Sequence, residues 1–206
     1  MYPYEILCMG KNCGIIECIN NIITLDSLYK KITKHGFKSF HEFFNSYFRD
    51  INNAKLSFAY SLAAYSLVCF ILRIKDRHNA NIMIDDQGHL IHIDFGFMIS
   101  NDPGNIEIDN TPFKLPSEWL TIIGLDGIYF NAFRDSMIRG FMAIQKNYPK
   151  ILILVEAMYK LNEDLPCFAG QQKAIEGISN RLFPVILGRG HKRAMNPSEA
   201  AEFIDV

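Results

Sequence analysis

The sequence predicts an α+β fold that is mostly helical. Of its 206 residues, 49% are hydrophobic and 21% are charged, which is the balance of a folded chain with a buried core. Apolar residues recur at three- and four-residue spacing over several long segments, as in amphipathic helices. Two short apolar runs, at residues 82–84 and 90–93, flank a polar turn, as in a β-hairpin. At roughly 100–200 residues per domain, this length indicates a single domain.

The charge balance and the cysteines limit the classes of function. Lys and Arg number 21 against 22 Asp and Glu, so the net charge of -1 gives no basic field that would gather nucleic acid. The five cysteines include no C-x-x-C pair, which is typical of a reducing compartment. The N-terminus carries Glu5 and no basic segment, so we expect no signal peptide. These features predict a cytoplasmic protein that does not bind nucleic acid.

The first half of the chain begins with short elements and continues into one long helix. We expect two short strands around a turn within residues 4–16, and two short helices within 26–48. Asn52 or Asn53 is expected to cap a longer helix over about 54–74. Its apolar run is shorter than the ~20 residues of a bilayer span, so we interpret it as a buried core helix.

The second half begins with the predicted hairpin. A polar loop over 76–81 precedes its first strand, and residues 85–88 form the turn between the strands. Residues 100–116 are rich in Asn, Asp, Pro and Gly, which predicts a long surface loop of the kind that is usually functional or disordered. Helices are predicted over 117–124, 127–146 and 148–162, and two weaker helices end the chain.

Polar residues at the open end of the hairpin indicate a phosphotransfer site. Asp76 and Asn81 have the Asp-to-Asn spacing of a kinase catalytic loop, in which the Asp handles a hydroxyl proton and the Asn holds Mg²⁺. Turns also use Asp and Asn, so this spacing alone is a weak signal. The hairpin, however, brings Asn81 within about two residues of a position opposite Asp94. Amide and carboxylate oxygens suit Mg²⁺, and Phe95 and Gly96 complete the Asp-Phe-Gly motif of kinases.

A zinc site is the competing interpretation of the same region. His89, His92 and Asp94 form an H-x-x-H-x-D string, with His78 nearby. Residues three apart on a strand face opposite sides of the sheet, so His89 and His92 cannot both bind one metal. We expect His89 to be a solvent-facing turn residue and His92 to be a hydrogen-bonding residue of the core or of the site's surroundings.

Several strings resemble the phosphoinositide 3/4-kinase family, and within it most closely the type III phosphatidylinositol 4-kinases of the beta form. The catalytic-loop string KDRHNAN (75–81) and the string HIDFGF (92–97) match the family's D-R-H-x-x-N loop and its metal-binding segment. The string GIIE (14–17) is similar to the hinge before the adenine pocket, and PFKL (112–115) to the end of the lipid-selecting activation loop. The string LPCF (165–168) is similar to a segment of the C-terminal lobe.

The resemblance implies a partial kinase catalytic domain. Residues 15–206 would form the hinge and a kinase-like C-terminal lobe that holds the catalytic-loop hairpin, and residues 1–14 a strand remnant of the N-terminal lobe. In the family, a phosphate-covering loop and a lysine of the β-rich lobe lie before the hinge, and both contribute to catalysis. Only 14 residues precede Ile15, so we expect the chain taken alone to be a poor kinase.

The resemblance also assigns roles to individual residues. Asp76 and His78 are both candidates for activating the inositol hydroxyl, and the sequence does not decide between them. Lys114 would attract the phosphodiester of the lipid, although composition alone favours a solvated loop lysine equally. The full implied set comprises the catalytic residues Asp76, His78 and Arg77, the ATP-binding residues Glu17, Cys18, Ile19 and Ile93, the Mg²⁺ ligands Asn81 and Asp94, and the lipid-binding residues Lys114 and Lys75.

The implied reaction transfers the γ-phosphoryl group of ATP to the 4-hydroxyl of phosphatidylinositol, with Mg²⁺ as cofactor. The enzyme would act at the cytosolic face of intracellular, Golgi-type membranes as a peripheral protein. Small GTPases or adaptor proteins are compatible partners that the sequence does not specify. The alternative is a non-catalytic kinase lobe that binds a partner or a membrane.

Overall fold

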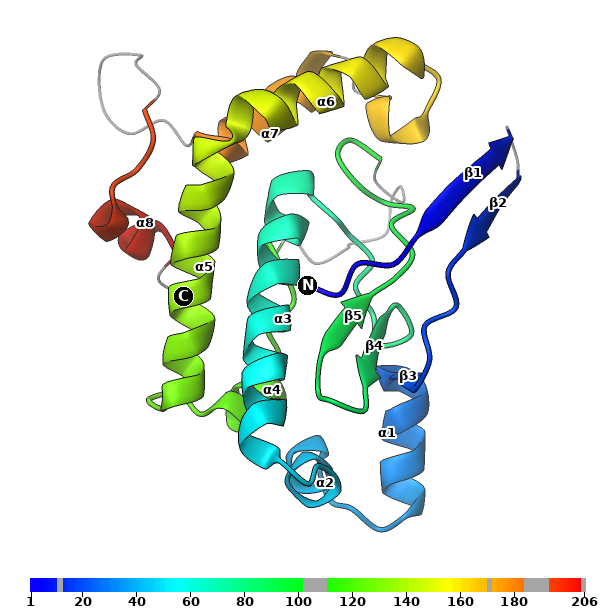
Figure 1. The fold of residues 1–206 in the computed structure, drawn as a ribbon, viewed down its shortest axis with the longest axis vertical. Helices are drawn as coiled ribbons and strands as arrows, with labels where there is room; N and C mark the ends of the chain where they lie inside the picture. Colours follow the sequence, from blue (N-terminus) through cyan, green and yellow to red (C-terminus); the bar gives the residue numbers. More distant parts are fainter. Residues whose placement is uncertain (11–12, 102–110, 170–171, 184–192, 205–206) are drawn as a thin grey trace.

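The computed structural model describes residues 1–10, 13–101, 111–169, 172–183 and 193–204. Within these ranges the chain is mostly helical with two small sheets, which confirms the predicted composition of the fold (Figure 1). In chain order the elements are β1 (Ile6–Gly10), β2 (Cys13–Ile16), β3 (Ile22–Thr24), α1 (Leu25–Lys34), α2 (Phe40–Tyr47), α3 (Ile51–Leu72), β4 (Ile82–Asp85), β5 (Leu90–His92), α4 (Ser117–Ile123), α5 (Ile128–Lys146), α6 (Tyr148–Leu161), a 3₁₀ turn (Pro166–Phe168), α7 (Gln172–Leu182) and α8 (Pro197–Ile204).

The two sheets are separate in the described structure. Strands β1 and β2 form an antiparallel hairpin whose residues are all exposed. Strands β3, β4 and β5 form the second sheet, in which β4 and β5 are the predicted hairpin. Strand β3 was not predicted, because its three residues are too few to show an alternating pattern; it pairs with β4 through Ile23 and Ile84.

Helix α3 is the central element and packs along α5 and against β5 (Figure 1). It begins at Ile51, three residues before the expected start, because the Asp50 carboxylate caps it by accepting a hydrogen bond from the Asn53 N–H at 3.1 Å. The predicted caps at Asn52 and Asn53 were therefore wrong. By length and composition α3 could cross a membrane, but 56% of the relevant window is buried inside the fold, in agreement with a core helix.

The end of α3 positions the loop that follows it. Arg73 adopts a left-handed conformation (φ 51°), which ends the helix and turns the chain toward the sheet. The Lys75 N–H then donates to the Phe97 carbonyl at 2.9 Å, and the Ile99 N–H to the Leu72 carbonyl at 2.7 Å. These bonds hold residues 73–75 against the chain that leaves β5, so the segments before and after the hairpin lie together.

The remaining predicted helices are present with small changes at their ends. Helices α4, α5 and α6 match the predicted segments to within one residue at each end, and α7 and α8 are the two weaker helices. The predicted loop over 100–116 is described at its two ends, and residues 102–110 lie outside the described residues. The large side chains that are fully buried include Trp119, Phe40, Phe44, Phe58 and Phe141, which join α2, α3, α4 and α5 in one core.

Candidate active site

The loop of residues 76–81 between α3 and β4 is held by its own polar groups. The Asn81 side-chain amide donates to the Asp76 carbonyl at 3.1 Å and to the Asp76 carboxylate at 3.4 Å. The Asn81 N–H donates to the carbonyl of His78 at 3.0 Å. Asp76 has a positive φ of 60°, a conformation that non-glycine residues adopt mainly where their surroundings enforce it. The loop therefore presents Asp76 and Asn81 in a fixed relation.

The two candidate bases lie next to each other. His78 Nε2 is 3.7 Å from Asp76 Oδ1, while His78 Nδ1 accepts a hydrogen bond from the Ala80 N–H at 3.2 Å. Because Nδ1 is an acceptor, a neutral His78 ring carries its proton on Nε2, the nitrogen that faces Asp76. The two groups are adjacent without a direct hydrogen bond at 3.7 Å, and the geometry leaves open which of them accepts the proton of a substrate hydroxyl.

Arg77 connects the catalytic loop to the Asp-Phe-Gly segment. Its guanidinium donates to the carbonyls of Lys75 (2.9 Å), Ile93 (2.8 Å) and Asp94, and lies 5.5 Å from the centre of the Phe95 ring. Burial lowers the pKa of Arg77 below its usual value. Arg77, which the sequence places among the catalytic residues, thus bonds three backbone acceptors on two segments, and its place between Asp76 and His78 in the sequence does not reveal these contacts.

The predicted metal ligands lie at the same end of the hairpin. Ile82 pairs with His92, and the Ile93 N–H donates to the Asn81 carbonyl at 3.1 Å, so Asp94 is one residue beyond the position opposite Asn81. The Asp94 side chain is exposed, and its Oδ1 accepts from the Gly96 N–H at 3.2 Å. The Asn81 amide nitrogen is directed at Asp76. One amide and one carboxylate oxygen are suitable donors for Mg²⁺, although the metal assignment itself stays a prediction.

The structure does not favour a zinc site. His89 Nδ1 lies 2.8 Å from Asp85 Oδ2, so the expected solvent-facing turn residue is instead half-buried and bound to a carboxylate. His92 is buried and stacks on Tyr65, with ring centres 4.4 Å apart. Within the described parts of the chain, no cluster of three or more His, Cys, Asp or Glu side chains is suited to hold a metal. His92 is thus a residue of the core, which is one of the two locations expected from the sequence.

The predicted catalytic and lipid-binding residues line one hollow of about 290 Å³, which we call the catalytic-loop hollow. The catalytic loop and the segment before it form one wall, and Thr111, Phe113 and Lys114 form the other; the complete described lining is Ile74, Lys75, Asp76, Arg77, His78, Thr111, Phe113 and Lys114. These walls are more than thirty residues apart in sequence. The fold therefore brings together Asp76, His78, Arg77, Lys75 and Lys114.

The side chain of Lys114 is held at the wall of this hollow by specific contacts. Its Nζ donates to Asn79 Oδ1 at 2.7 Å and lies 5.8 Å from the ring centre of Trp119. Burial lowers the pKa of Lys114; the Glu118 carboxylate opposes this shift and Arg77 adds to it. Lys114 is consequently not a freely solvated loop lysine. Asn79, which holds it, was missed in the sequence because it occupies an unspecified position of the D-R-H-x-x-N motif.

Three of the four predicted adenine-binding residues line one hollow. Glu17, Cys18 and Ile19 line a separate hollow of about 250 Å³, which reaches the turn of the β4–β5 hairpin. Ile93, half-buried before Asp94, is not among the described lining residues of that hollow. The assignment of these four residues to ATP remains a prediction.

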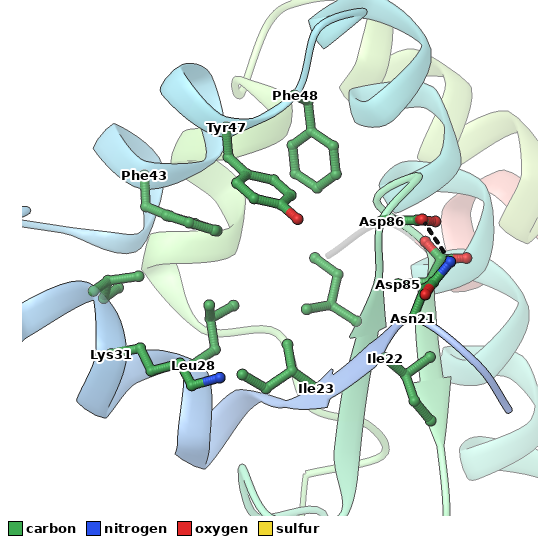
Figure 2. Close-up of a pocket in the computed structure, with 12 residues that line it drawn as sticks. Asn21, Ile22, Ile23, Leu28, Lys31, Phe43, Tyr47, Phe48, Asp85 and Asp86 are labelled. Atoms are coloured by element: carbon green, nitrogen blue, oxygen red, sulfur yellow. Dashed lines mark hydrogen bonds between the residues drawn. The ribbon is translucent and has the colours of Figure 1, made fainter. Parts of the chain in front are cut away.

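Another hollow of about 400 Å³ contains none of the predicted site residues. Figure 2 shows it between α1, α2 and the β3–β4 pair, with Phe43 and Tyr47 on one side and Ile23 on the other. At its edge the Asn21 amide donates to the Asp86 carboxylate at 3.0 Å. This contact ties the chain before β3 to the hairpin turn, so we attribute the region to the packing of the sheet.

The arrangement agrees with the class of kinase-type phosphotransferases: Asp76 and His78 lie side by side, Asn81 and Asp94 lie at the foot of a hairpin, and Arg77 joins the catalytic loop to the Asp-Phe-Gly segment. A family model described as "Phosphatidylinositol 3- and 4-kinase" matches residues 1–169. The chain therefore belongs to the phosphatidylinositol 3- and 4-kinase family.

Individual relatives agree with this family assignment. The chain is 41% identical over 187 residues to "Phosphatidylinositol 4-kinase" of Dictyostelium discoideum, which covers 88% of the chain and 16% of that protein. It is 37% identical over 192 residues to "Phosphatidylinositol 4-kinase beta 2" of Arabidopsis thaliana (87% and 17%). It is 38% identical over 172 residues to "Phosphatidylinositol 4-kinase beta" of Danio rerio (82% and 20%). The chain spans about a fifth or less of the length of these relatives.

Proposed function

We propose that this chain is the catalytic-loop region of a phosphatidylinositol 4-kinase, which transfers the γ-phosphoryl group of ATP to the 4-hydroxyl of phosphatidylinositol. The observation that carries the proposal is the catalytic-loop hollow, which an adjacent Asp–His pair lines together with the lysine of the PFKL segment. In this interpretation residues 15–206 are the hinge and the C-terminal lobe, and residues 1–14 are strands of the N-terminal lobe. The names and identities of the relatives support the substrate.

Each residue of the hollow has its own role in the proposed reaction. The inositol hydroxyl lies against Asp76 and His78, one of which accepts its proton as the hydroxyl oxygen attacks phosphorus. Lys114 and Lys75 attract the phosphodiester of the lipid and so orient the inositol ring. Arg77 acts through the backbone, because its three hydrogen bonds keep Asp94 in register with the catalytic loop. Positioning of this kind supplies a large part of phosphoryl-transfer catalysis.

The nucleotide side of the site rests on the hinge and on the foot of the hairpin. Glu17, Cys18, Ile19 and Ile93 would contact the adenine ring. Asn81 and Asp94 would hold Mg²⁺, which when bound neutralises negative charge on the phosphates. The protein would work at the cytosolic face of Golgi-type membranes, where phosphatidylinositol is presented; small GTPases or adaptor proteins are compatible partners that no contact here specifies.

A lipid kinase assay on the protein that carries this chain tests the proposal. Radiolabelled Mg-ATP and phosphatidylinositol vesicles should yield labelled phosphatidylinositol phosphate. Asp94→Asn should lower the rate by at least ~10²-fold, because a charged metal ligand is lost. Asp126→Asn, at an exposed carboxylate between α4 and α5, is the matched control and should leave the rate unchanged. Vesicle binding without any turnover would instead support the non-catalytic alternative.

A further inference from the structure

A large apolar cavity lies directly behind the catalytic-loop hollow. It measures about 890 Å³, within the ~300–1,000 Å³ range of ligand pockets. Helices α3, α4, α5 and α8 and the segment 111–116 surround it. Among its described lining residues, Lys114 is the only one that carries a charge. We call it the α8 cavity.

The α8 cavity and the catalytic-loop hollow share a wall. Thr111, Phe113 and Lys114 line both spaces. The ammonium of Lys114 is bound to Asn79 of the catalytic loop, so its methylene stem is the part that faces the apolar side. The wall is therefore polar toward the catalytic loop and apolar toward α8, and a ligand that touches both faces must itself be amphiphilic.

The inner side of the cavity is lined by buried apolar residues, and its rim is more exposed. Met137 and Phe141 of α5 are almost fully buried at its inner side. Phe203 of α8 is 42% exposed and lies at the rim, with its ring centre 5.4 Å from that of Phe141 and 5.9 Å from that of Phe70. An apolar chain that passes Phe203 would meet aromatic and aliphatic side chains on all described sides.

We propose that the α8 cavity receives one acyl chain of the phosphatidylinositol molecule whose head group lies in the catalytic-loop hollow. This inference rests on the proposed function, because it takes the lipid head group to lie beside Lys114. A peptide is a poorer occupant, since its backbone N–H and C=O groups would find few partners in an almost wholly apolar wall. A phosphatidylinositol molecule has the required polar and apolar parts on one glycerol.

The cavity would serve mainly to orient the lipid head group and would add little to the affinity for a membrane. In a bilayer the chain already lies in an apolar environment, so its transfer into the cavity brings little hydrophobic gain. Short-chain lipids dissolved in water do gain, by about fourfold in affinity for each methylene that enters, from ~0.8 kcal/mol per buried methylene. The affinity for soluble short-chain lipids therefore reports on the cavity, whereas the affinity for vesicles would not.

The test is calorimetric titration of the chain with dibutanoyl, dihexanoyl and dioctanoyl phosphatidylinositol, each below its aggregation concentration and without ATP. Affinity should rise by up to about fourfold per methylene of one chain. Leu120→Trp and Ile204→Trp, which fill the cavity from α4 and α8, should each abolish most of this rise. Leu154→Trp, at a 65% exposed position on α6, is the matched control and should keep it.

Three results would overturn the inference: a flat chain-length dependence in the unmodified chain, an unchanged dependence in both filled variants, or equal affinity for dioctanoyl phosphatidylcholine. Circular dichroism checks that the variants fold; if neither does, the comparison of the two head groups on the unmodified chain still decides. Because ATP is absent, a missing kinase activity would count against the proposed function and leave the chain-length result standing.

Discussion

Replacing Arg77 by Lys should loosen the junction between the catalytic loop and the Asp-Phe-Gly segment. Arg77 donates to three backbone carbonyls through a planar fork, whereas a lysine ammonium is a point charge that cannot reach all three. Each hydrogen bond from a charged donor contributes ~1.5–3 kcal/mol. The bond to Ile93 is partly buried and should count nearly in full, while the exposed carbonyl of Asp94 can turn to water. We expect a loss of about 2–4 kcal/mol in the free energy of unfolding.

Urea denaturation of the unmodified chain, Arg77→Lys and Arg49→Lys measures this loss. Arg49 is exposed after α2, so its conservative replacement should change stability by less than ~0.5 kcal/mol. Hydrogen exchange adds a local readout: the Lys75 N–H, which donates to Phe97 across the junction, should exchange faster in Arg77→Lys. Equal stability and equal exchange in the two variants would refute the assigned role of Arg77.

Two further predictions concern His92 and Lys114. Burial, with the nearby Arg77 and Lys114 cations, lowers the pKa of His92 to about 3 in the folded chain, so the unfolded chain takes up the proton first as the pH falls below ~6.5. As the pH falls from ~6.5 to about 3, the free energy of unfolding of the unmodified chain should decrease by up to ~1.4 kcal/mol per pH unit more than that of His92→Gln. Parallel pH profiles of the two proteins would contradict this. Lys114→Ala should lower phosphatidylinositol phosphorylation more than ATP hydrolysis, measured side by side; equal losses would show that Lys114 is structural.

The sequence predicted the elements that have a strong local pattern. Helices α4 to α6 repeat apolar residues over two or more turns, and the β4–β5 hairpin has two apolar runs around a polar turn, so their positions follow from local periodicity. Strand β3 has three residues and exists because β4 offers it a partner, which periodicity cannot show. The cap at Asp50 was missed because three polar residues near the helix start were all acceptable caps.

The motifs of the site could be predicted from the sequence, but the contacts between its segments could not. The spacing of Asp76, Asn81 and Asp94 follows from the loop and the hairpin register. The contacts of Arg77 with Ile93 and of Lys114 with Asn79 join residues 16 and 35 positions apart, and they depend on how the end of α3 meets the end of the hairpin. No short motif encodes such contacts. The α8 cavity is a further case, because its lining comes from four helices and one loop.

The most direct test of the account is to determine which hydroxyl of phosphatidylinositol the protein phosphorylates. Lipid product labelled from γ-labelled Mg-ATP would be deacylated and its inositol phosphate separated by chromatography against the positional isomers. The account predicts label on the 4-hydroxyl, dependent on Asp94 and unaffected by Asp126→Asn. Label on another hydroxyl would contradict the proposed specificity, and the absence of any labelled lipid would contradict the proposal that the hollow of Asp76, His78 and Lys114 is an active site.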